Sequence, residues 1–313
     1  MASTILFAGS DKYWQAYREP IAQALEGAGV RAHLTDDPAT PPETVDYIVY
    51  MPLSSLRDFG PYRRVRMVQN LWAGVERIVT NPTLTQPLCR MVDPGLTRGM
   101  VEYVVGHAMR YHLGMDAHLF GQDGIWRHGV IPPLATTRPV AMLGLGALGQ
   151  ACAAALRGLG FPVLGWSRTQ KDLPGIECHA GEAGLEAVLA RAQIVVALVP
   201  LTPDTIGLLD ARRLALLPRG AFLINPGRGA LIDDAALLAA LDSGQLAHAT
   251  LDVFREEPLP SAHPFWAHPG VTVTPHIASE TRPETAAPVI AENIRRAEAG
   301  EPLLHLVDRG RGY

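Results

Sequence analysis

The sequence contains little cysteine, no block of basic residues and no histidine spacing that supports a metal site. Its three cysteines, widely separated in 313 residues, exclude a disulfide framework and suit a reducing compartment. A formal net charge of −4 without a basic segment argues against nucleic acid as the main partner. Neither a G-x-S-x-G nor a Walker sequence is present.

We expect neither a membrane span nor a signal peptide from this sequence. Its longest apolar run, residues 140–156, is interrupted by three glycines and Gln150, so a glycine turn explains this run better than a membrane helix. Residues 4–8 are strand-like and carry neither a basic region nor the long apolar core of a signal peptide. With 48% hydrophobic and 19% charged residues, the chain is globular and long enough for two domains. We therefore expect a cytoplasmic protein without a membrane partner.

A glycine-rich turn, G-x-G-x-x-G, follows an apolar segment that begins at residue 140. Gly144 allows a tight turn, Gly146 lets the backbone approach a pyrophosphate, and Gly149 lets helix and strand pack closely. A helix is expected over residues 151–159, stopped by Gly160, and a second apolar strand over 161–166. This βαβ context favours a dinucleotide site, which would also include Ala147 and Leu148, over a turn of small residues that serves packing alone.

Short apolar segments alternate with helical patterns along the chain, which is typical of parallel βα units. The expected strands, besides those of the glycine motif, are 5–8, 47–50, 67–69, 194–199, 221–225, 249–252 and 271–274. The expected helices are 13–28, 97–119, 186–191, 210–216, 234–241 and 283–299. Pro288 should kink the last helix or mark its true start.

The long helical candidate at 97–119 has a broad apolar face and precedes a connection, residues 121–137, that contains Trp126 and Ile131. A helix followed by an arm-like loop would suit dimerisation. A plain interdomain helix explains the pattern equally well.

Ligands of a doubly wound sheet bind outside the carboxyl ends of its strands. After the strand at 161–166 come Ser167, Arg168 and Thr169, where an NAD enzyme would carry an acid for the ribose 2′-hydroxyl. An arginine and two hydroxyls are the donors that a 2′-phosphate needs, so we expect NADP(H), with NAD(H) possible. A solvated surface arginine is the alternative. After the strand at 194–199, a stiff loop is suited to wall the cofactor; its candidate contacts are Val199, Pro200 and Thr205.

Two further strands each deliver a candidate catalytic residue to this edge. Arg228 follows the strand at 221–225 between two glycines, and its planar fork suits a carboxylate or a 2-keto acid. His276 follows the strand at 271–274 and a proline. Most of the eleven histidines should be surface or core residues, but His276 differs because it reaches the same edge as Arg228.

The chain resembles the D-2-hydroxyacid dehydrogenase family, and within it the glyoxylate/hydroxypyruvate reductase A branch. The resemblance rests on seven segments in one order, residues 71–76, 100–103, 144–149, 200–205, 225–233, 252–258 and 274–279. It implies an α/β protein of two Rossmann-like doubly wound parallel-sheet domains, with the nucleotide domain inserted into the substrate domain. Residues 1–98 with 282–313 would bind the substrate, and residues 99–281 would bind NAD(P), with a dimerisation helix and arm at 99–137.

The resemblance also implies roles for single residues. Arg228 would bind the substrate's carboxylate and carbonyl, His276 would be the general acid of reduction, and Glu257 would orient His276. Asp252 would lie near the nicotinamide carboxamide. Backbone N–H groups of the turn Trp72, Ala73, Gly74 and Val75 would contact the substrate carboxylate. The chain departs from the family at Glu76, where Asp is usual, and at 167–169, where the acid of NAD-dependent members is missing.

These features predict an NADPH-dependent reductase of small 2-keto acids, glyoxylate or hydroxypyruvate, that gives D-2-hydroxy acids and acts as a homodimer. Hydride transfer leaves developing negative charge on the ketone oxygen, which a nearby imidazolium neutralises by proton transfer. One alternative is a reductase of bulkier keto acids such as phenylpyruvate or hydroxyphenylpyruvate. Another is a non-catalytic, nucleotide-sensing protein like the corepressors that resemble this family.

Overall fold

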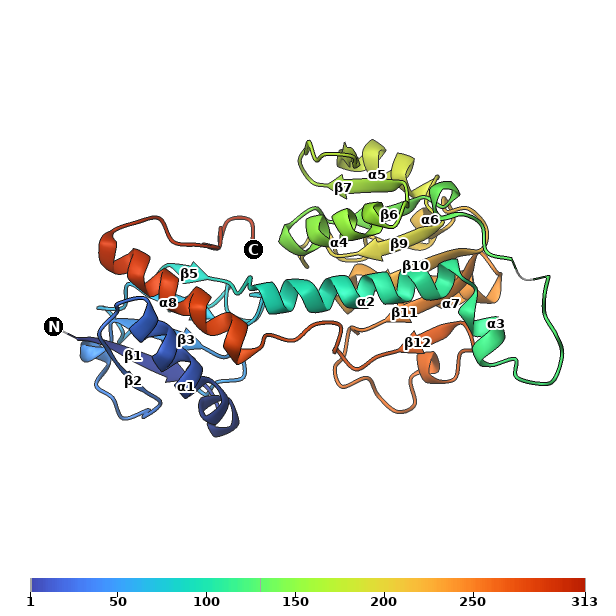
Figure 1. Cartoon of the computed structure of the whole chain (residues 1–313). Helices are drawn as coiled ribbons and strands as arrows, with labels where there is room; N and C mark the ends of the chain where they lie inside the picture. Colours follow the sequence, from blue (N-terminus) through green and yellow to red (C-terminus); the bar gives the residue numbers. More distant parts are fainter. Residues whose placement is uncertain (1, 130, 313) are drawn as a thin grey trace. The chain divides into compact units, whose positions relative to one another are not determined.

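The computed structural model describes residues 2–129 and 131–312. Residues 1 and 313 of the predicted substrate-binding segments, and residue 130 of the predicted arm, lie outside this description. The chain divides into two compact units, Met1–Leu96 with Glu280–Tyr313 (the first unit) and Thr97–Ser279 (the inserted unit). Each unit contains one sheet whose strands are all parallel (Figure 1), which confirms the predicted fold class.

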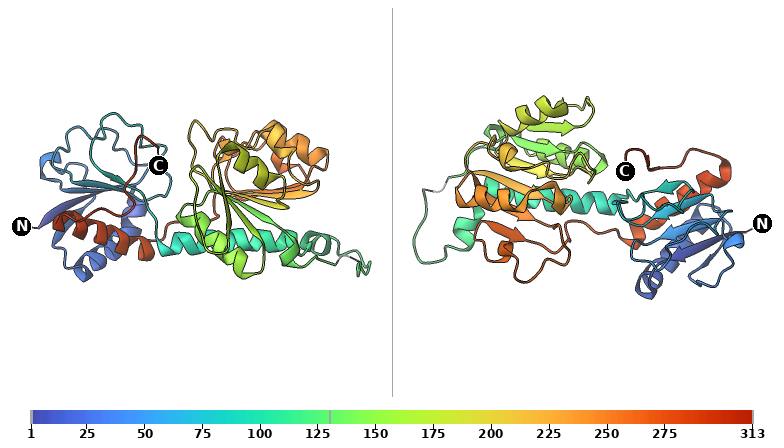
Figure 2. Two further views of the ribbon diagram at one scale, coloured as in Figure 1. Left: turned by 90° about the horizontal axis from the view of Figure 1, so that it is seen from above. Right: turned by 180° about the vertical axis from the view of Figure 1, so that it is seen from behind.

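The first unit has a five-stranded sheet of order β2-β1-β3-β4-β5. Its strands are β1 (Ser3–Ala8), β2 (Ala32–Thr35), β3 (Tyr47–Tyr50), β4 (Met67–Asn70) and β5 (Leu88–Cys89). Helices α1 (Asp11–Gly27) and α8 (Pro283–Ala299) lie side by side (Figures 1 and 2) and bury Ile21 and Ile290 against β1 and β3. The strand order reverses between β1 and β3, as in doubly wound folds.

The inserted unit has a seven-stranded sheet of order β12-β11-β10-β9-β6-β7-β8. Its strands are β6 (Val140–Leu143), β7 (Val163–Ser167), β8 (Glu177–Ala180), β9 (Ile194–Ala197), β10 (Ala221–Asn225), β11 (Leu246–Leu251) and β12 (Val271–Val273). Its helices are α2 (Pro94–His112, which belongs to this unit from Thr97 on), α3 (Met115–Leu119), α4 (Ala147–Gly158), α5 (Gly181–Leu189), α6 (Ala211–Leu214) and α7 (Asp234–Asp242). The order reverses between β6 and β9, which is the position where Rossmann folds bind dinucleotides.

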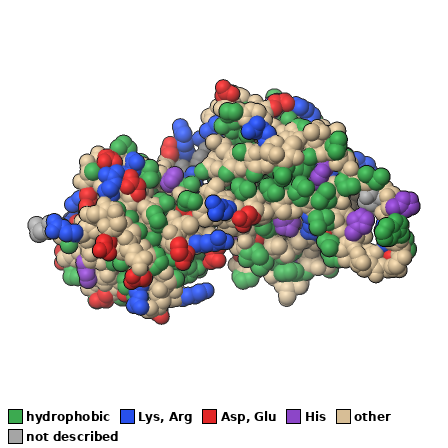
Figure 3. Space-filling model, viewed as in Figure 1, with side chains coloured by type: hydrophobic (Ala, Val, Ile, Leu, Met, Phe, Trp, Pro, Cys, Tyr) green, Lys and Arg blue, Asp and Glu red, His purple; other side chains and the backbone are tan. Residues whose placement is uncertain are grey.

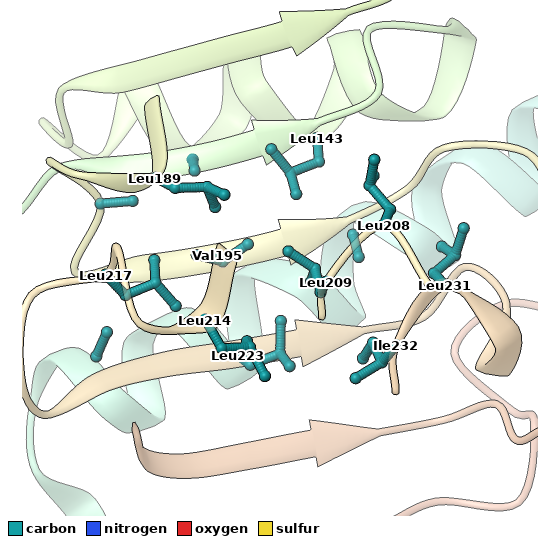
Figure 4. Packing of buried hydrophobic residues seen from close by; sticks show 14 of the residues in the cluster. Leu143, Leu189, Val195, Leu208, Leu209, Leu214, Leu217, Leu223, Leu231 and Ile232 are labelled. Atoms are coloured by element: carbon teal, nitrogen blue, oxygen red, sulfur yellow. The ribbon is translucent and has the colours of Figure 1, made fainter. Parts of the chain in front are cut away.

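Both faces of this sheet are buried, which explains why its central strands are continuous apolar runs. Ala141 and Leu143 of β6 pack with side chains of α5, α6 and α7 in one cluster. Figure 4 shows Leu143 of this cluster together with Leu189 of α5 and Leu214 of α6. Val140 and Met142 of the same strand pack with α2 and α4 on the opposite face. The alternation fixes the register of β6, and hence the position at which the glycine turn leaves the sheet.

The predicted helix at 97–119 is wrong in one respect, because it is two helices. The chain breaks between α2 and α3 at Gly114, whose φ of +61° lies in the left-handed region that glycine adopts without a Cβ penalty. The apolar pattern continued through this glycine and concealed the break. None of the described helices is long and apolar enough to cross a membrane.

Other differences concern edges and helix starts. The short strands β2, β5 and β8 were not predicted, because β2 and β8 are partly exposed edge strands and β5 has only two residues. Helix α4 starts at Ala147, so the glycine motif itself supplies its first turn. Helix α5 lies at Gly181–Leu189, earlier than the predicted 186–191. Pro288 does not mark the start of the last helix, since α8 begins at Pro283 and continues through it.

Candidate active site

Three loops at the carboxyl ends of adjacent strands carry the predicted catalytic residues. Arg228 follows β10, Glu257 follows β11 and His276 follows β12, and these strands are neighbours in the parallel sheet. The loops also contact one another, because a Cβ on Gly229 would lie 2.0 Å from the main-chain carbon of Phe254. The sheet therefore brings the three loops together at one edge.

His276 and Glu257 form a hydrogen-bonded pair. The Nδ1 atom of His276 lies 2.8 Å from Oε2 of Glu257, and Oε1 of Glu257 accepts from the main-chain N–H of Phe254 at 3.0 Å. Both carboxylate oxygens are thus engaged, which fixes the direction from which Glu257 approaches the ring. The His276 side chain is half exposed, and its Nε2 atom has no hydrogen-bond partner among residues 2–129 and 131–312. The pair leaves one ring nitrogen available to a ligand.

The backbone of His276 has a φ of +55°, which a non-glycine residue adopts only when its surroundings hold it there. Asp252 supplies much of that restraint. Its main-chain oxygen accepts from the N–H of His276 at 2.8 Å, and its carboxylate accepts from the N–H groups of Ile277 and Ala278 at 2.9 and 2.8 Å. Asp252 has no exposed surface, and its predicted contact with the nicotinamide carboxamide stays a prediction.

The Arg228 loop is held by Asn225, the last residue of β10. The Asn225 side-chain amide donates to the main-chain oxygen of Arg228 at 3.0 Å, and its carbonyl accepts from the N–H of Gly227 at 3.2 Å. A Cβ on Gly227 would lie 2.6 Å from the oxygen of Ala197, so both glycines that flank the arginine are required by close backbone approach. Arg228 itself is partly buried and donates from one guanidinium nitrogen to Gly227 O at 2.7 Å.

The glycine turn after β6 has the geometry that a pyrophosphate needs. Gly144 has a φ of +107°, and a Cβ on Gly149 would lie 1.8 Å from Gly144 O, so these two positions accept only glycine. In contrast, a Cβ on Gly146 would meet nothing within 4 Å. Gly146 caps α4 without a side-chain hydrogen bond, and Gly146 and Ala147 are exposed, whereas Leu148 is partly buried. The first N–H groups of α4 therefore face open space, which fits an anionic ligand.

The other predicted cofactor contacts lie at the ends of β7 and β9. Ser167 ends β7 and donates from its hydroxyl to Thr169 O at 2.8 Å, while Arg168 and Thr169 are exposed. Val199 is buried in the core and Pro200 is partly buried. Thr205 donates to Pro200 O at 2.7 Å, so its hydroxyl stabilises the loop.

In the first unit, the turn at residues 72–75 follows β4. The side-chain amide of Asn70 donates to the main-chain oxygens of Trp72 and Gly74 at 2.7 and 2.9 Å, which fixes the turn. The N–H groups of Ala73, Gly74 and Val75 have no acceptor among the described residues, so this turn presents donors to an anion.

Sequence reasoning assigned no role to Asn70, Asn225 or Tyr103. Both asparagines end a buried strand and hold the loop that follows, and an amide at that position is the signal that could have identified them. Tyr103 lies in the segment 100–103 that resembles the family. Its hydroxyl lies 2.7 Å from that of Thr274, a contact that depends on tertiary packing and has no sequence signal. In the described part of the chain, no group of three His, Cys, Asp or Glu residues could hold a metal ion.

Comparison with known proteins gives matches over most of the chain. The family described as D-isomer specific 2-hydroxyacid dehydrogenase, NAD binding domain, matches residues 105–278. A glyoxylate/hydroxypyruvate reductase A from Yersinia enterocolitica is 44% identical over 228 residues, 72% of this chain and 72% of that protein.

Two solved structures match along the whole chain. A D-isomer specific 2-hydroxyacid dehydrogenase from Xanthobacter autotrophicus Py2, in complex with NADPH and MES, covers 100% of each chain at 41% identity, with a TM-score of 0.90. An NADPH-dependent glyoxylate/hydroxypyruvate reductase from Sinorhizobium meliloti, in complex with NADP and sulfate, is 35% identical with a TM-score of 0.86. This match covers 99% of the present chain and 100% of the Sinorhizobium chain.

Proposed function

The chain belongs to the D-isomer specific 2-hydroxyacid dehydrogenase family, and from this membership we propose that it is an NADPH-dependent reductase of small 2-keto acids. Glyoxylate and hydroxypyruvate are its substrates, and glycolate and the D-2-hydroxy acid D-glycerate are the respective products. The names of the Yersinia and Sinorhizobium relatives support this substrate class, and the NADPH and NADP complexes of the two solved relatives support the cofactor.

The His276–Glu257 pair is the observation that carries the proposal. When NADPH is bound, it supplies the hydride to the keto carbon. His276 donates a proton from Nε2 to the carbonyl oxygen, a contribution of about 10²- to 10⁴-fold to the rate. Glu257, 2.8 Å from Nδ1, keeps the ring in the tautomer and orientation that this transfer requires, and compensates the charge of the imidazolium.

Arg228 and the turn at residues 72–75 recognise the substrate's carboxylate. A guanidinium keeps its charge at every physiological pH and binds a carboxylate with two parallel hydrogen bonds. The N–H groups of Ala73, Gly74 and Val75 are the neutral donors that the first unit offers to a carboxylate.

We propose that residues 99–281, nearly the same range as the inserted unit, bind the nucleotide. The N–H groups at Gly146 and Ala147 bind the pyrophosphate at the start of α4, with Leu148 and the loop from Val199 and Pro200 to Thr205 beside them. Contacts of Ser167, Arg168 and Thr169 with the 2′-phosphate give the preference for NADPH over NADH. Residues 1–98 with 282–313 form the substrate-binding domain.

We also propose that the protein is a cytoplasmic homodimer that joins through residues 99–137, with neither a nucleic acid nor a membrane as partner. The support for the dimer is a set of exposed apolar side chains after α3 (Figure 3), namely Phe120, Ile125, Trp126, Ile131 and Leu134. Trp126 alone is 86% exposed. Sedimentation should give twice the mass of one chain, and Trp126→Ser should shift the protein toward the monomer.

A panel of keto acids tests the proposed function. Purified protein is incubated with glyoxylate, hydroxypyruvate, phenylpyruvate or hydroxyphenylpyruvate, each with NADPH and with NADH, and nucleotide oxidation is followed by absorbance. We expect the highest kcat/KM with the two small keto acids and NADPH, and D-glycerate as the product of hydroxypyruvate. A preference for the aromatic acids would contradict the substrate class, and NADPH binding without any turnover would contradict the enzyme assignment.

A further inference from the structure

A chain of hydrogen bonds runs from helix α2 to the loop that carries His276. The hydroxyl of Thr274 donates to Oδ1 of Asp252 at 2.6 Å, so the lone pairs of the same hydroxyl remain to accept from the phenol of Tyr103, 2.7 Å away. Burial raises the pKa of Tyr103, so its phenol keeps the proton that it donates. All three residues lie in the inserted unit.

These hydrogen bonds end at the Asp252 carboxylate, which restrains the backbone at His276. The Asp252 carboxylate, which is fully buried, also accepts from the N–H groups of Ile277 and Ala278, the two residues after His276. Thr274 lies two residues before His276, so the carboxylate binds the loop on both sides of the histidine. A residue with a φ of +55° keeps this conformation only if such contacts hold it, and the Thr274 hydroxyl is one of three donors to the carboxylate.

We propose that Tyr103 and Thr274 are positioning residues for His276, acting through Asp252. They hold the Thr274–Ala278 loop in the one conformation in which the imidazole meets both Glu257 and the substrate. The proposal rests on the proposed reductase function, because it assumes that His276 is the proton donor. Neither residue contacts the reacting atoms. Their effect is on the fraction of time for which the ring is correctly placed.

Helix α2 offers a matched control. Tyr111 lies eight residues after Tyr103 on the same helix, and its phenol is hydrogen-bonded to the hydroxyl of Thr250 on β11. Tyr111→Phe therefore removes a tyrosine–threonine hydrogen bond of the same kind. Among the described residues, the other partner of the Thr250 hydroxyl is Nδ1 of His107 at 3.3 Å, which packs against the ring of Tyr103 but is not hydrogen-bonded to the His276 loop. Tyr103→Phe keeps the ring of Tyr103, which packs 4.5 Å from the ring of His107, and removes only its hydroxyl.

The experiment compares wild type with Tyr103→Phe, Thr274→Val, Thr274→Ser and Tyr111→Phe. It measures kcat and KM for hydroxypyruvate, Kd for NADPH, and amide hydrogen exchange of residues 276–278 in the nucleotide-free protein. We expect Thr274→Val to lower kcat about tenfold and to raise exchange of these amides by a similar factor, with KM and Kd within about twofold. Tyr103→Phe should give a smaller change in the same direction, Thr274→Ser should restore the wild-type values, and Tyr111→Phe should change neither kcat nor this exchange.

The proposal is overturned if Thr274→Val leaves kcat and exchange unchanged, or if Tyr111→Phe lowers kcat as much as Tyr103→Phe does. If Thr274→Val does not fold, the comparison of Tyr103→Phe with Tyr111→Phe decides the question. If the wild type shows no turnover, the reductase function fails, but the exchange measurement still tests whether Tyr103 and Thr274 hold the loop.

Discussion

Replacing Gly146 by alanine should weaken NADPH binding and leave the stability of the fold nearly unchanged. The added methyl group would meet no protein atom within 4 Å, and the φ of −75° at this position is one that alanine adopts without strain. Alanine is a poorer N-cap than glycine, but it also lowers the entropy of the unfolded chain, and the two effects are of similar size, about 0.5–1 kcal/mol. The free energy of unfolding should therefore change by less than about 1 kcal/mol.

The same methyl group lies where we propose that the pyrophosphate approaches the start of α4. If it displaces the phosphate enough to lose one hydrogen bond between a main-chain N–H and a charged oxygen, the loss is about 1.5–3 kcal/mol. Since 1.4 kcal/mol is a factor of ten, Kd for NADPH should rise about 10- to 150-fold. KM for the keto acid, which does not contact this turn, should stay near its wild-type value.

Titration calorimetry measures Kd for NADPH, and thermal unfolding of the nucleotide-free protein measures the change in stability. Gly158→Ala is the control, because Gly158 ends the same helix and a Cβ there would also meet nothing within 4 Å. It should leave NADPH affinity close to wild type and raise Tm slightly, because alanine favours the helix by about 0.5–1 kcal/mol. Unchanged NADPH affinity in Gly146→Ala would refute the assignment of this turn to the pyrophosphate.

Three other substitutions test separate parts of the account. Arg168→Asp should lower the ratio of kcat/KM for NADPH to that for NADH by about 10- to 100-fold, because it replaces a donor to the 2′-phosphate by a like charge; an unchanged ratio would remove Arg168 from cofactor choice. Glu257→Gln should lower kcat about 10- to 100-fold with unchanged Kd for NADPH, since the neutral amide no longer compensates the imidazolium of His276; an undiminished kcat would contradict the role of Glu257. Burial, together with the charge of Arg110, lowers the pKa of His248 to about 4, so its neutral form is favoured in the folded protein. The free energy of unfolding should fall as pH drops below about 6.5, by about 1–2 kcal/mol at pH 4 because solvent screens this partly exposed ring. His248→Gln should make the urea-unfolding profile flatter over this pH interval, and an identical pH dependence would contradict the argument.

Those parts of the fold that are buried on both faces could be predicted from sequence. Strands β3 and β10 are apolar because both faces of each sheet are covered, by helices on both sides of β10 and by helices on one side and loop residues on the other side of β3. Helix α8 at 283–299 has a proline at its start and a glycine at its end. The edge strands β2 and β8 have mixed burial and no such pattern. The break at Gly114 was hidden because the apolar periodicity of α2 continues into α3.

The candidate site also has parts that sequence could predict and parts that it could not. Gly144, Gly149 and the residues just after the strands could be found from sequence, because backbone geometry and strand direction dictate their positions. The restraint of His276 by Asp252, and of Asp252 by Thr274 and Tyr103, could not. Those contacts join residues that are up to 171 positions apart in the chain, and only the packed sheet brings them together.

The most direct test of the central claim is turnover of hydroxypyruvate with NADPH by the wild type and by His276→Asn, with NADPH affinity measured in both. We predict steady NADPH oxidation with D-glycerate as product in the wild type, and a kcat at least about 10²-fold lower in the variant at unchanged Kd for NADPH. Equal turnover in the two proteins, or no oxidation of NADPH by the wild type, would contradict the account.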